Sequence, residues 1–151
     1  MVFEIIDFNG KKVELEPRVE LYRIYDFMDN ELPGLAIALY EIGASNFEEK
    51  YAMLTVSFGQ FIGPKNCAYI DTHNCYFADQ LLRYNIAEPT PLTKKSGFCT
   101  CPLWQFNEDF LQEIGGANYQ KYIDAYEKYF DIVFGLHDNS TKQMILHWAQ
   151  I

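Results

Sequence analysis

Four cysteines and three histidines are the residues best suited to chemistry in this 151-residue chain, because thiolate and imidazole groups bind metals and act as nucleophiles. Five of them lie in the middle of the chain: Cys67, His73, Cys75, Cys99 and Cys101. Structural zinc sites usually pair cysteines two residues apart, whereas the spacings here are His-x-Cys and Cys-x-Cys. We therefore expect reduced thiols with no metal or cofactor, and a zinc site is the alternative.

A cysteine nucleophile would need a base beside it. The order of elements brings His73 closest to Cys67 or Cys99, but no nucleophile motif surrounds either cysteine. The glycine-bearing segment 59–63 lacks the Lys-Ser/Thr of a phosphate-binding loop. We expect a protein that is not an enzyme.

A small anionic ligand is the second chemistry to consider. Polar side chains follow a predicted buried strand, and a locally basic segment, 88–97, lies further along the chain. If the chain binds a nucleotide-like signal or acts as a weak hydrolase, the site would use Asp71, Thr72, His73, Lys94, Lys95 and Ser96. The alternative is that the first three residues only cap the helix that follows, and that 88–97 is a solvated loop.

Charge is the strongest compositional feature, with 12 basic and 21 acidic residues and a net charge of −9. Such a chain repels phosphate backbones, so we expect no direct binding to nucleic acid. Much of the acidity precedes residue 50, which predicts a surface that docks onto a basic protein partner. The residues predicted for that surface are Glu14, Glu16, Glu20, Asp26, Asp29 and Glu31. The alternative is a solvated face that keeps the chain soluble.

Alternating apolar residues and turn signals predict a series of strands through the first two thirds of the chain. Asn9-Gly10 predicts an initial hairpin, with positive φ at both turn positions. The predicted strands cover residues 3–8, 12–16, 19–27, 35–42, 51–58, 67–71 and 98–106, and Pro102 restricts the last to a sheet edge or a bulge. A helix over 75–85, with Asn74 as its N-cap, should pack on the sheet.

Helical periodicity replaces the strand pattern after residue 106. Asn107 with two acidic residues predicts a helix start, and Gly115-Gly116 predicts its end. Residues 118–134 then form an amphipathic helix with four tyrosines on its apolar stripe, which faces the core or supports a homodimer. A last helix is predicted over 141–149. The expected fold is α+β, an antiparallel meander of six to seven strands with one packed helix (1–106) and C-terminal helices (107–151) in a single domain.

The N-terminus lacks the basic and apolar regions of a signal peptide, and no apolar stretch is long enough for a bilayer. We expect a cytosolic protein.

Two short motifs resemble the family called domain of unknown function four-three-one-three. They are the segment 66–74, ending in Asp71-Thr72-His73-Asn74, and the turn Ser96-Gly97-Phe98-Cys99. The resemblance covers roughly residues 1–110 in element order, and the tyrosine-rich helix looks like an addition. The family has no assigned catalytic residues. The resemblance implies an accessory protein of phages or mobile elements of Gram-positive bacteria, acting as an inhibitor of a host defence effector of the CRISPR or restriction type. The alternative is a conjugation accessory subunit.

Overall fold

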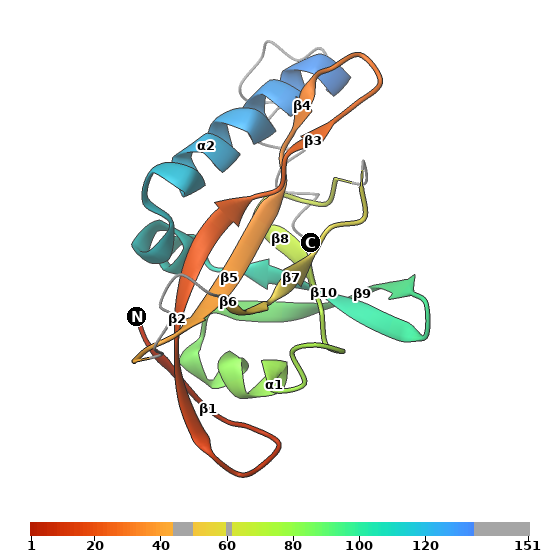
Figure 1. The fold of residues 1–151 in the computed structure, drawn as a ribbon. Helices are drawn as coiled ribbons and strands as arrows, with labels where there is room; N and C mark the ends of the chain where they lie inside the picture. The colour runs from red at the N-terminus through yellow and green to blue at the C-terminus, as the bar shows by residue number, and fades with distance from the viewer. Residues whose placement is uncertain (44–49, 60–61, 135–151) are drawn as a thin grey trace.

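The computed structural model describes residues 1–43, 50–59 and 62–134 of the chain. The described part has two four-stranded antiparallel sheets, a two-stranded hairpin, a short helical segment and a long helix (Figure 1). The predicted α+β class is confirmed. The single meander of six to seven strands is wrong, because the strands divide among three sheets.

The first sheet has the strand order β1-β2-β5-β6. Its strands are β1 (Phe3–Ile6), β2 (Lys12–Leu21), β5 (Leu35–Glu41) and β6 (Lys50–Met53). Buried and exposed residues alternate along β2, as one covered and one solvated face require. The prediction of separate strands over 12–16 and 19–27 is wrong, since β2 continues through Pro17. Pairing with β1 ends at Leu15, so Pro17 interrupts no ladder on that side.

The second sheet has the strand order β7-β8-β10-β9. Its strands are β7 (Thr55–Val56), β8 (Cys67–Ile70), β9 (Ala87–Ser96) and β10 (Cys99–Phe106). The predicted strand over 51–58 divides at Leu54 into β6 of the first sheet and β7 of the second. Leu54 is fully buried, and its N–H donates to the carbonyl of Ile37 at 2.9 Å. The chain therefore crosses between sheets at this residue.

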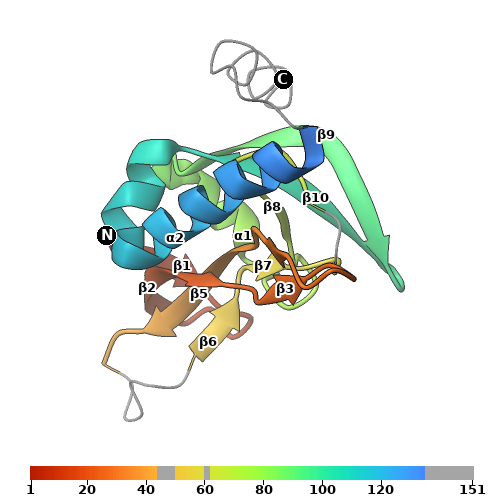
Figure 2. The same ribbon diagram turned by 90° about the horizontal axis from the view of Figure 1, so that it is seen from above.

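Strand β9 takes up all of the segment 88–97 except Gly97, so the solvated loop expected there is wrong. β9 lies at the end of the strand order, where Pro89 and Pro91 are tolerated because one edge needs no donors. We expected Pro102 at a sheet edge or a bulge; β10 is not an edge strand, and its pairing with β9 shifts register between Pro102 and Trp104, as the second alternative requires. Beyond the bulge the two strands form a ribbon that extends away from the body of the molecule (Figures 1 and 2).

The helix predicted over 75–85 is shorter than expected. It comprises α1 (Ala78–Leu81) and a 3-10 turn, η1 (Leu82–Tyr84), and its N-cap position is Phe77 rather than Asn74. Side chains of this segment cover the outer edge of β1: the hydroxyl of Tyr84 accepts the N–H of Glu4 at 2.8 Å, and Gln80 accepts the N–H of Ile6 at 2.8 Å. That edge is therefore closed to other strands.

Helix α2 (Glu108–Phe134) starts where the sequence predicts and is interrupted at Gly116, whose φ of 50° and ψ of −133° are not helical. The predicted stop at Gly115-Gly116 is thus a break between two helical parts. Neither α2 nor any other helix of the described residues is long and apolar enough to cross a bilayer. The helix predicted over 141–149 lies outside the described residues.

The tyrosine stripe of α2 packs into the core, which was the first of the two roles that we expected for it. Its hydroxyls bind the loop that precedes β8: Tyr119 donates to the Asn66 side-chain oxygen and Tyr122 accepts the Asn66 N–H, both at 2.9 Å. Tyr126 donates to the carbonyl of Gly63 at 3.0 Å. All three tyrosines are almost fully buried, so a homodimer through residues 118–134 would have to use another face of the helix.

Candidate docking surface

The hairpin of β3 (Ile24–Tyr25) and β4 (Glu31–Leu32) carries three of the six predicted partner-binding carboxylates. Asp26 fixes its turn, because one carboxylate oxygen accepts the backbone N–H groups of Met28 at 2.8 Å and Asn30 at 2.9 Å. These bonds, that to Asn30 first, hold the pKa of Asp26 below its ordinary value. The other two, Asp29 and Glu31, are exposed. The tip is therefore both negatively charged and held in one conformation.

Large apolar side chains stand at the same tip. Phe27 is 91% exposed and Met28 is 69% exposed, while Tyr25 beside them is 49% exposed. An isolated exposed apolar residue is ordinary, but three within four positions of one hairpin are unusual, and exposed apolar side chains that gather in this way are typical of interaction sites.

The turn between β1 and β2 repeats this geometry. Asp7 accepts the N–H groups of Asn9 at 2.9 Å and Lys11 at 2.8 Å. In both turns the aspartate thus binds the N–H groups of the residues two and four positions after it. Gly10 has φ +77° and Asn9 does not have positive φ, so the hairpin is confirmed but our expectation for both turn positions is wrong. This turn also presents a phenylalanine, Phe8, at 81% exposure.

The two phenylalanines differ in their surroundings. The ring of Phe8 stacks on Tyr76 with centroids 3.6 Å apart, and the Phe8 N–H donates to the Tyr76 hydroxyl at 3.2 Å. Phe8 is therefore held against its own molecule, which makes it a natural control for Phe27.

The outward face of β2 holds the other three predicted carboxylates among basic residues. Arg18 lies 3.6 Å from Glu16, and its guanidinium carbon lies 4.2 Å from the centre of the Tyr40 ring. Glu20 lies 2.8 Å from Lys50 and accepts a 2.7 Å hydrogen bond from Tyr40. Burial opposes ionisation of Glu20, but the hydrogen bonds from Lys50 and Tyr40 together with the charges of Lys50 and Arg18 outweigh it, so the pKa of Glu20 is lowered.

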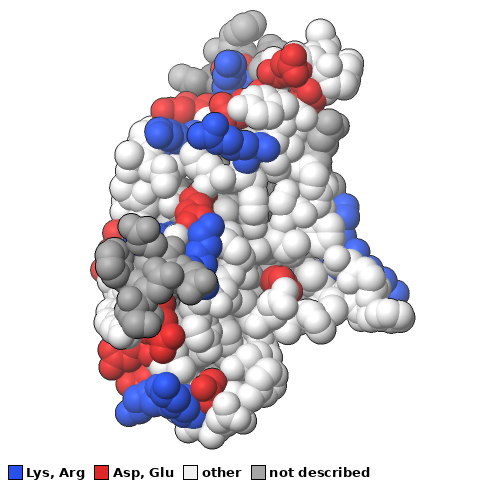
Figure 3. All heavy atoms as spheres, viewed as in Figure 1, with Lys and Arg blue, Asp and Glu red and all other residues white. Residues whose placement is uncertain are grey.

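The predicted acidic surface therefore has two separate parts. On the side of the molecule shown in Figure 3, basic groups lie among the acidic ones, so the first sheet does not present one continuous negative face. The β2 carboxylate that stays exposed without an ion pair in the described residues is Glu14. The β3-β4 tip is the part where carboxylates and apolar side chains coincide.

The six residues predicted for an anionic ligand lie on two segments on either side of β10, the turn after β8 and the second half of β9. Lys94 on β9 pairs with Cys101 on β10. The negative charge of Asp71, which follows β8, contributes to the raised pKa of Cys101. Asp71 accepts hydrogen bonds from the backbone and side chain of Asn74, at 3.2 and 2.8 Å, in a local turn. The rest are solvent-facing or half-buried: Thr72, His73, Lys95 and Ser96. An anionic-ligand site here stays a prediction.

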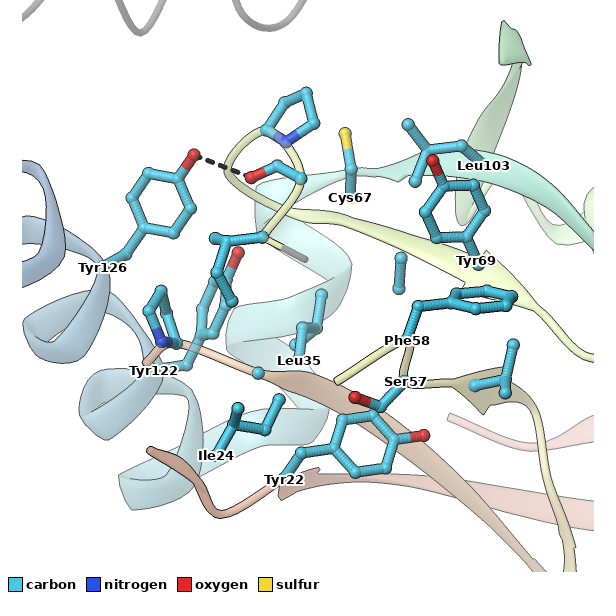
Figure 4. A pocket seen from close by; sticks show the side chains of 17 residues that line it. Tyr22, Ile24, Leu35, Ser57, Phe58, Cys67, Tyr69, Leu103, Tyr122 and Tyr126 are labelled. Atoms are coloured by element: carbon cyan, nitrogen blue, oxygen red, sulfur yellow. Dashed lines mark hydrogen bonds between the residues drawn. The ribbon is translucent and has the colours of Figure 1, made fainter. Parts of the chain in front are cut away.

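A pocket does exist at the base of the β3-β4 hairpin, between it, the β7-β8 region and α2 (Figure 4). It encloses about 460 Å³ when the open solvent at its mouth is included. Aromatic rings dominate its wall, among them Tyr22, Phe58, Tyr69 and Tyr122, and no Asp, Glu, Lys, Arg or His lines it among the described residues. Such a wall suits a neutral group and offers no cation to an anion.

Three of the four thiols lie in surroundings that disfavour the reactive thiolate. Burial raises the pKa of Cys67 and of Cys75 to about 12, and burial followed by the charge of Asp71 raises that of Cys101. Cys75 donates to the carbonyl of Met53 at 3.2 Å. Within the described ranges no three His, Cys, Asp or Glu side chains gather where they would hold a metal ion.

The sequence contained a sign of the hairpin tips that we did not use. Asp7-Phe8 and Asp26-Phe27 are the same dipeptide in the same kind of turn, and each exposes its phenylalanine. Phe98, at the tip of the β9-β10 ribbon, is fully exposed as well.

Comparison with protein families gives one match. The family model described as "Domain of unknown function (DUF4313)" matches residues 22–130. The matched segment contains the β3-β4 hairpin and extends through Tyr119, Tyr122 and Tyr126 of α2, so the tyrosine-rich helix is part of the family's domain and not an addition. It leaves out residues 1–21, which we had included. No curated protein and no solved structure matches the chain.

Proposed function

The chain belongs to the family of domains of unknown function DUF4313, and we propose that it acts as a non-catalytic protein-binding module that docks through the β3-β4 hairpin. The observation that carries this proposal is the exposure of Phe27 and Met28 on a turn that Asp26 holds in place. Aromatic side chains presented on rigid elements are typical interface anchors, because little entropy is lost when they bind.

Burial of Phe27 and Met28 in a partner would contribute a substantial part of the free energy of binding. Moving a side chain such as Phe or Met from water into an apolar pocket contributes about 1.5–3 kcal/mol. Two such side chains would supply much of the energy of a micromolar complex, which is about 8 kcal/mol. The remainder would come from the rim of the interface.

The charge at the tip indicates the kind of partner. Asp29 and Glu31 follow the apolar pair in the same hairpin and are exposed, and the whole chain carries a net charge of −9. A partner with an apolar pocket rimmed by lysine or arginine would complement this tip, and attraction between the two charges would speed their encounter. Binding should weaken as salt is added, since screening acts on exposed charges.

The more specific proposal is that the partner is a host defence effector of the CRISPR or restriction type, whose basic groove for nucleic acid the hairpin would occupy. That step, like a phage or mobile-element origin and action in the host cytosol, derives from the family resemblance. A conjugation subunit would use the same hairpin. The raised pKa values of Cys67, Cys75 and Cys101 support a non-catalytic role, because a protonated thiol is a poor nucleophile.

Quantitative capture of binding proteins from the host cell tests this proposal. The bait is the full chain, compared with the double variant Phe27→Ser/Met28→Ser and with Phe8→Ser as a matched control of equal chemistry on the twin turn. We expect a basic protein that is recovered by the wild type and by Phe8→Ser, and lost with the double variant. Recovery that is equal for all three baits, at unchanged thermal stability, would refute docking through this hairpin.

A further inference from the structure

The β9-β10 ribbon differs in charge from the rest of the chain. Between Pro89 and Asn107 there are two lysines, Lys94 and Lys95, and no aspartate or glutamate, in a chain with a net charge of −9. The ribbon extends from the body of the molecule on the side away from α2's N-terminal part (Figures 1 and 2), and Figure 3 shows basic groups along it. It is thus a positively charged arm on an acidic protein.

The outer edge of β9 is a place where another strand can add. β9 is an end strand of its sheet, and its two prolines, at positions 89 and 91, both lie in its first half. The N–H of Leu92 donates to the Thr90 hydroxyl at 3.2 Å, whereas Thr93 to Ser96 contain no proline, and alternate N–H groups of a strand face its outer edge. The edge of β1 shows the contrast, since Gln80 and Tyr84 cover its backbone groups. Edge strands left uncovered are the usual sites of strand addition by a partner.

Apolar side chains accompany this edge. Leu92 is 55% exposed and Phe98 is fully exposed at the turn, where Gly97 takes φ +62° and so allows a tight two-residue connection. A strand lying along β9 would cover part of both side chains, and their burial would add to the backbone hydrogen bonds.

We propose that the β9 edge from Leu92 to Phe98 binds an extended segment of a partner protein that contains two consecutive acidic residues. Neighbouring residues of a strand point to opposite faces, so Lys94 and Lys95 place one ammonium on each face of the ribbon. The Lys94 ammonium lies 5.4 Å from the centre of the Phe58 ring, and Lys95 is exposed. Two adjacent carboxylates on an added strand would meet both.

Charge argues against three other partners for this edge: a second copy of the chain, nucleic acid and an anionic membrane. A second copy pairing antiparallel about Lys94 would set that lysine opposite itself, and like charges facing each other destabilise a strand pair. Nucleic acid and anionic membranes would be repelled by the rest of this acidic chain, and two lysines offer little compensation. An acidic peptide strand carries far less charge than a nucleic acid or an anionic membrane. It also forms backbone hydrogen bonds with the edge of β9, which a nucleic acid or a membrane cannot do.

This site is separate from the β3-β4 hairpin, so the two proposals can fail independently. The test is an NMR titration of the isotope-labelled full chain with the capped peptide Thr-Thr-Val-Glu-Glu-Val-Thr-Thr at low salt. We expect saturable shifts of the backbone amides between Leu92 and Phe98, unchanged by Phe27→Ser. The Lys95→Glu variant should bind this peptide about fivefold more weakly, and changing to lysine the one glutamate of the peptide that meets position 95 should restore the binding.

The same peptide with alternate amides methylated is the matched control, because it keeps both charges but cannot donate to the strand edge. Equal binding of the methylated peptide would overturn strand addition. Absence of saturable shifts, shifts confined to other regions, or tighter binding of an oligothymidine or of phosphatidylserine vesicles would also overturn the proposal. So would shifts at Leu92–Ser96 that appear on concentrating the protein alone, since they would indicate pairing between two copies.

Discussion

Replacement of Tyr122 by phenylalanine tests how the long helix holds the second sheet. The Tyr122 hydroxyl accepts the backbone N–H of Asn66 at 2.9 Å, and Asn66 is only 7% exposed with φ +65°. Removing that oxygen leaves a buried N–H without a partner, which costs about 1–3 kcal/mol. Since small domains are stable by about 5–15 kcal/mol, the loss should be plain in a urea titration of the full chain.

The Tyr119 hydroxyl binds the same asparagine as the Tyr122 hydroxyl. Tyr119 donates to the Asn66 side chain at 2.9 Å, and burial raises the pKa of Tyr119 to about 12, so it remains a donor at any ordinary pH. The Asn66 carbonyl in turn accepts the N–H of Phe106 in β10 at 2.8 Å. One asparagine thus joins α2 to the second sheet.

The control for this experiment is Tyr129→Phe, a half-buried tyrosine of the same helix whose hydroxyl is bonded to no residue that the structure describes. We expect it to change the free energy of unfolding by less than about 0.5 kcal/mol. If Tyr122→Phe is no more destabilising than Tyr129→Phe, at equal slopes in urea, the role assigned to Asn66 is refuted.

Three further outcomes follow. Gly116→Ala should lower the free energy of unfolding by about 1–3 kcal/mol, because φ 50° with ψ −133° is strained for any side chain; an unchanged melting temperature would contradict the break in α2. Asp26→Asn should destabilise the chain at neutral pH and much less in acid, since the folded pKa of Asp26 is lowered and its contribution is lost as pH falls through that pKa; a difference in unfolding free energy that is constant with pH would contradict this. Iodoacetamide should label Cys99 before Cys67 and Cys75, whose pKa values burial raises to about 12; rapid labelling of Cys75 in the folded protein would contradict its burial.

Local signals in the sequence located several elements well. The hairpin at Asn9-Gly10, the bulge at Pro102 and the break at Gly115-Gly116 each depend on residues whose backbone preferences act within a turn or two. Helical periodicity placed the tyrosines on one stripe for the same reason, and the burial of that stripe was one of the two outcomes it left open.

Other features depended on pairing between distant segments, which local patterns do not contain. Residues 88–97 hold two prolines and a glycine and resemble a loop, but β10 pairs with them and makes them a strand. Nothing near Leu54 marks the change from one sheet to the other, because it results from a hydrogen bond to the distant carbonyl of Ile37 and from the burial of the Leu54 side chain. The single predicted meander failed at this point.

The candidate docking surface was predictable from the sequence only in its acidic residues. The acidic residues were placed from composition, but their division into a β2 face with ion pairs and a hairpin tip without them needed the positions of Arg18 and Lys50. The exposure of Phe27 could have been suspected from the repeated Asp-Phe turn, although an apolar residue is usually assigned to the core.

Photo-crosslinking from a benzoylphenylalanine placed at position 27, in the living host cell, tests the central claim most directly. The claim predicts a crosslinked adduct with one basic protein from position 27, and none from the same probe at position 8 of the twin turn. Docking through the β3-β4 hairpin would be contradicted by adducts from position 8 but not from position 27. It would also be contradicted if a folded, expressed chain gave no adduct from position 27.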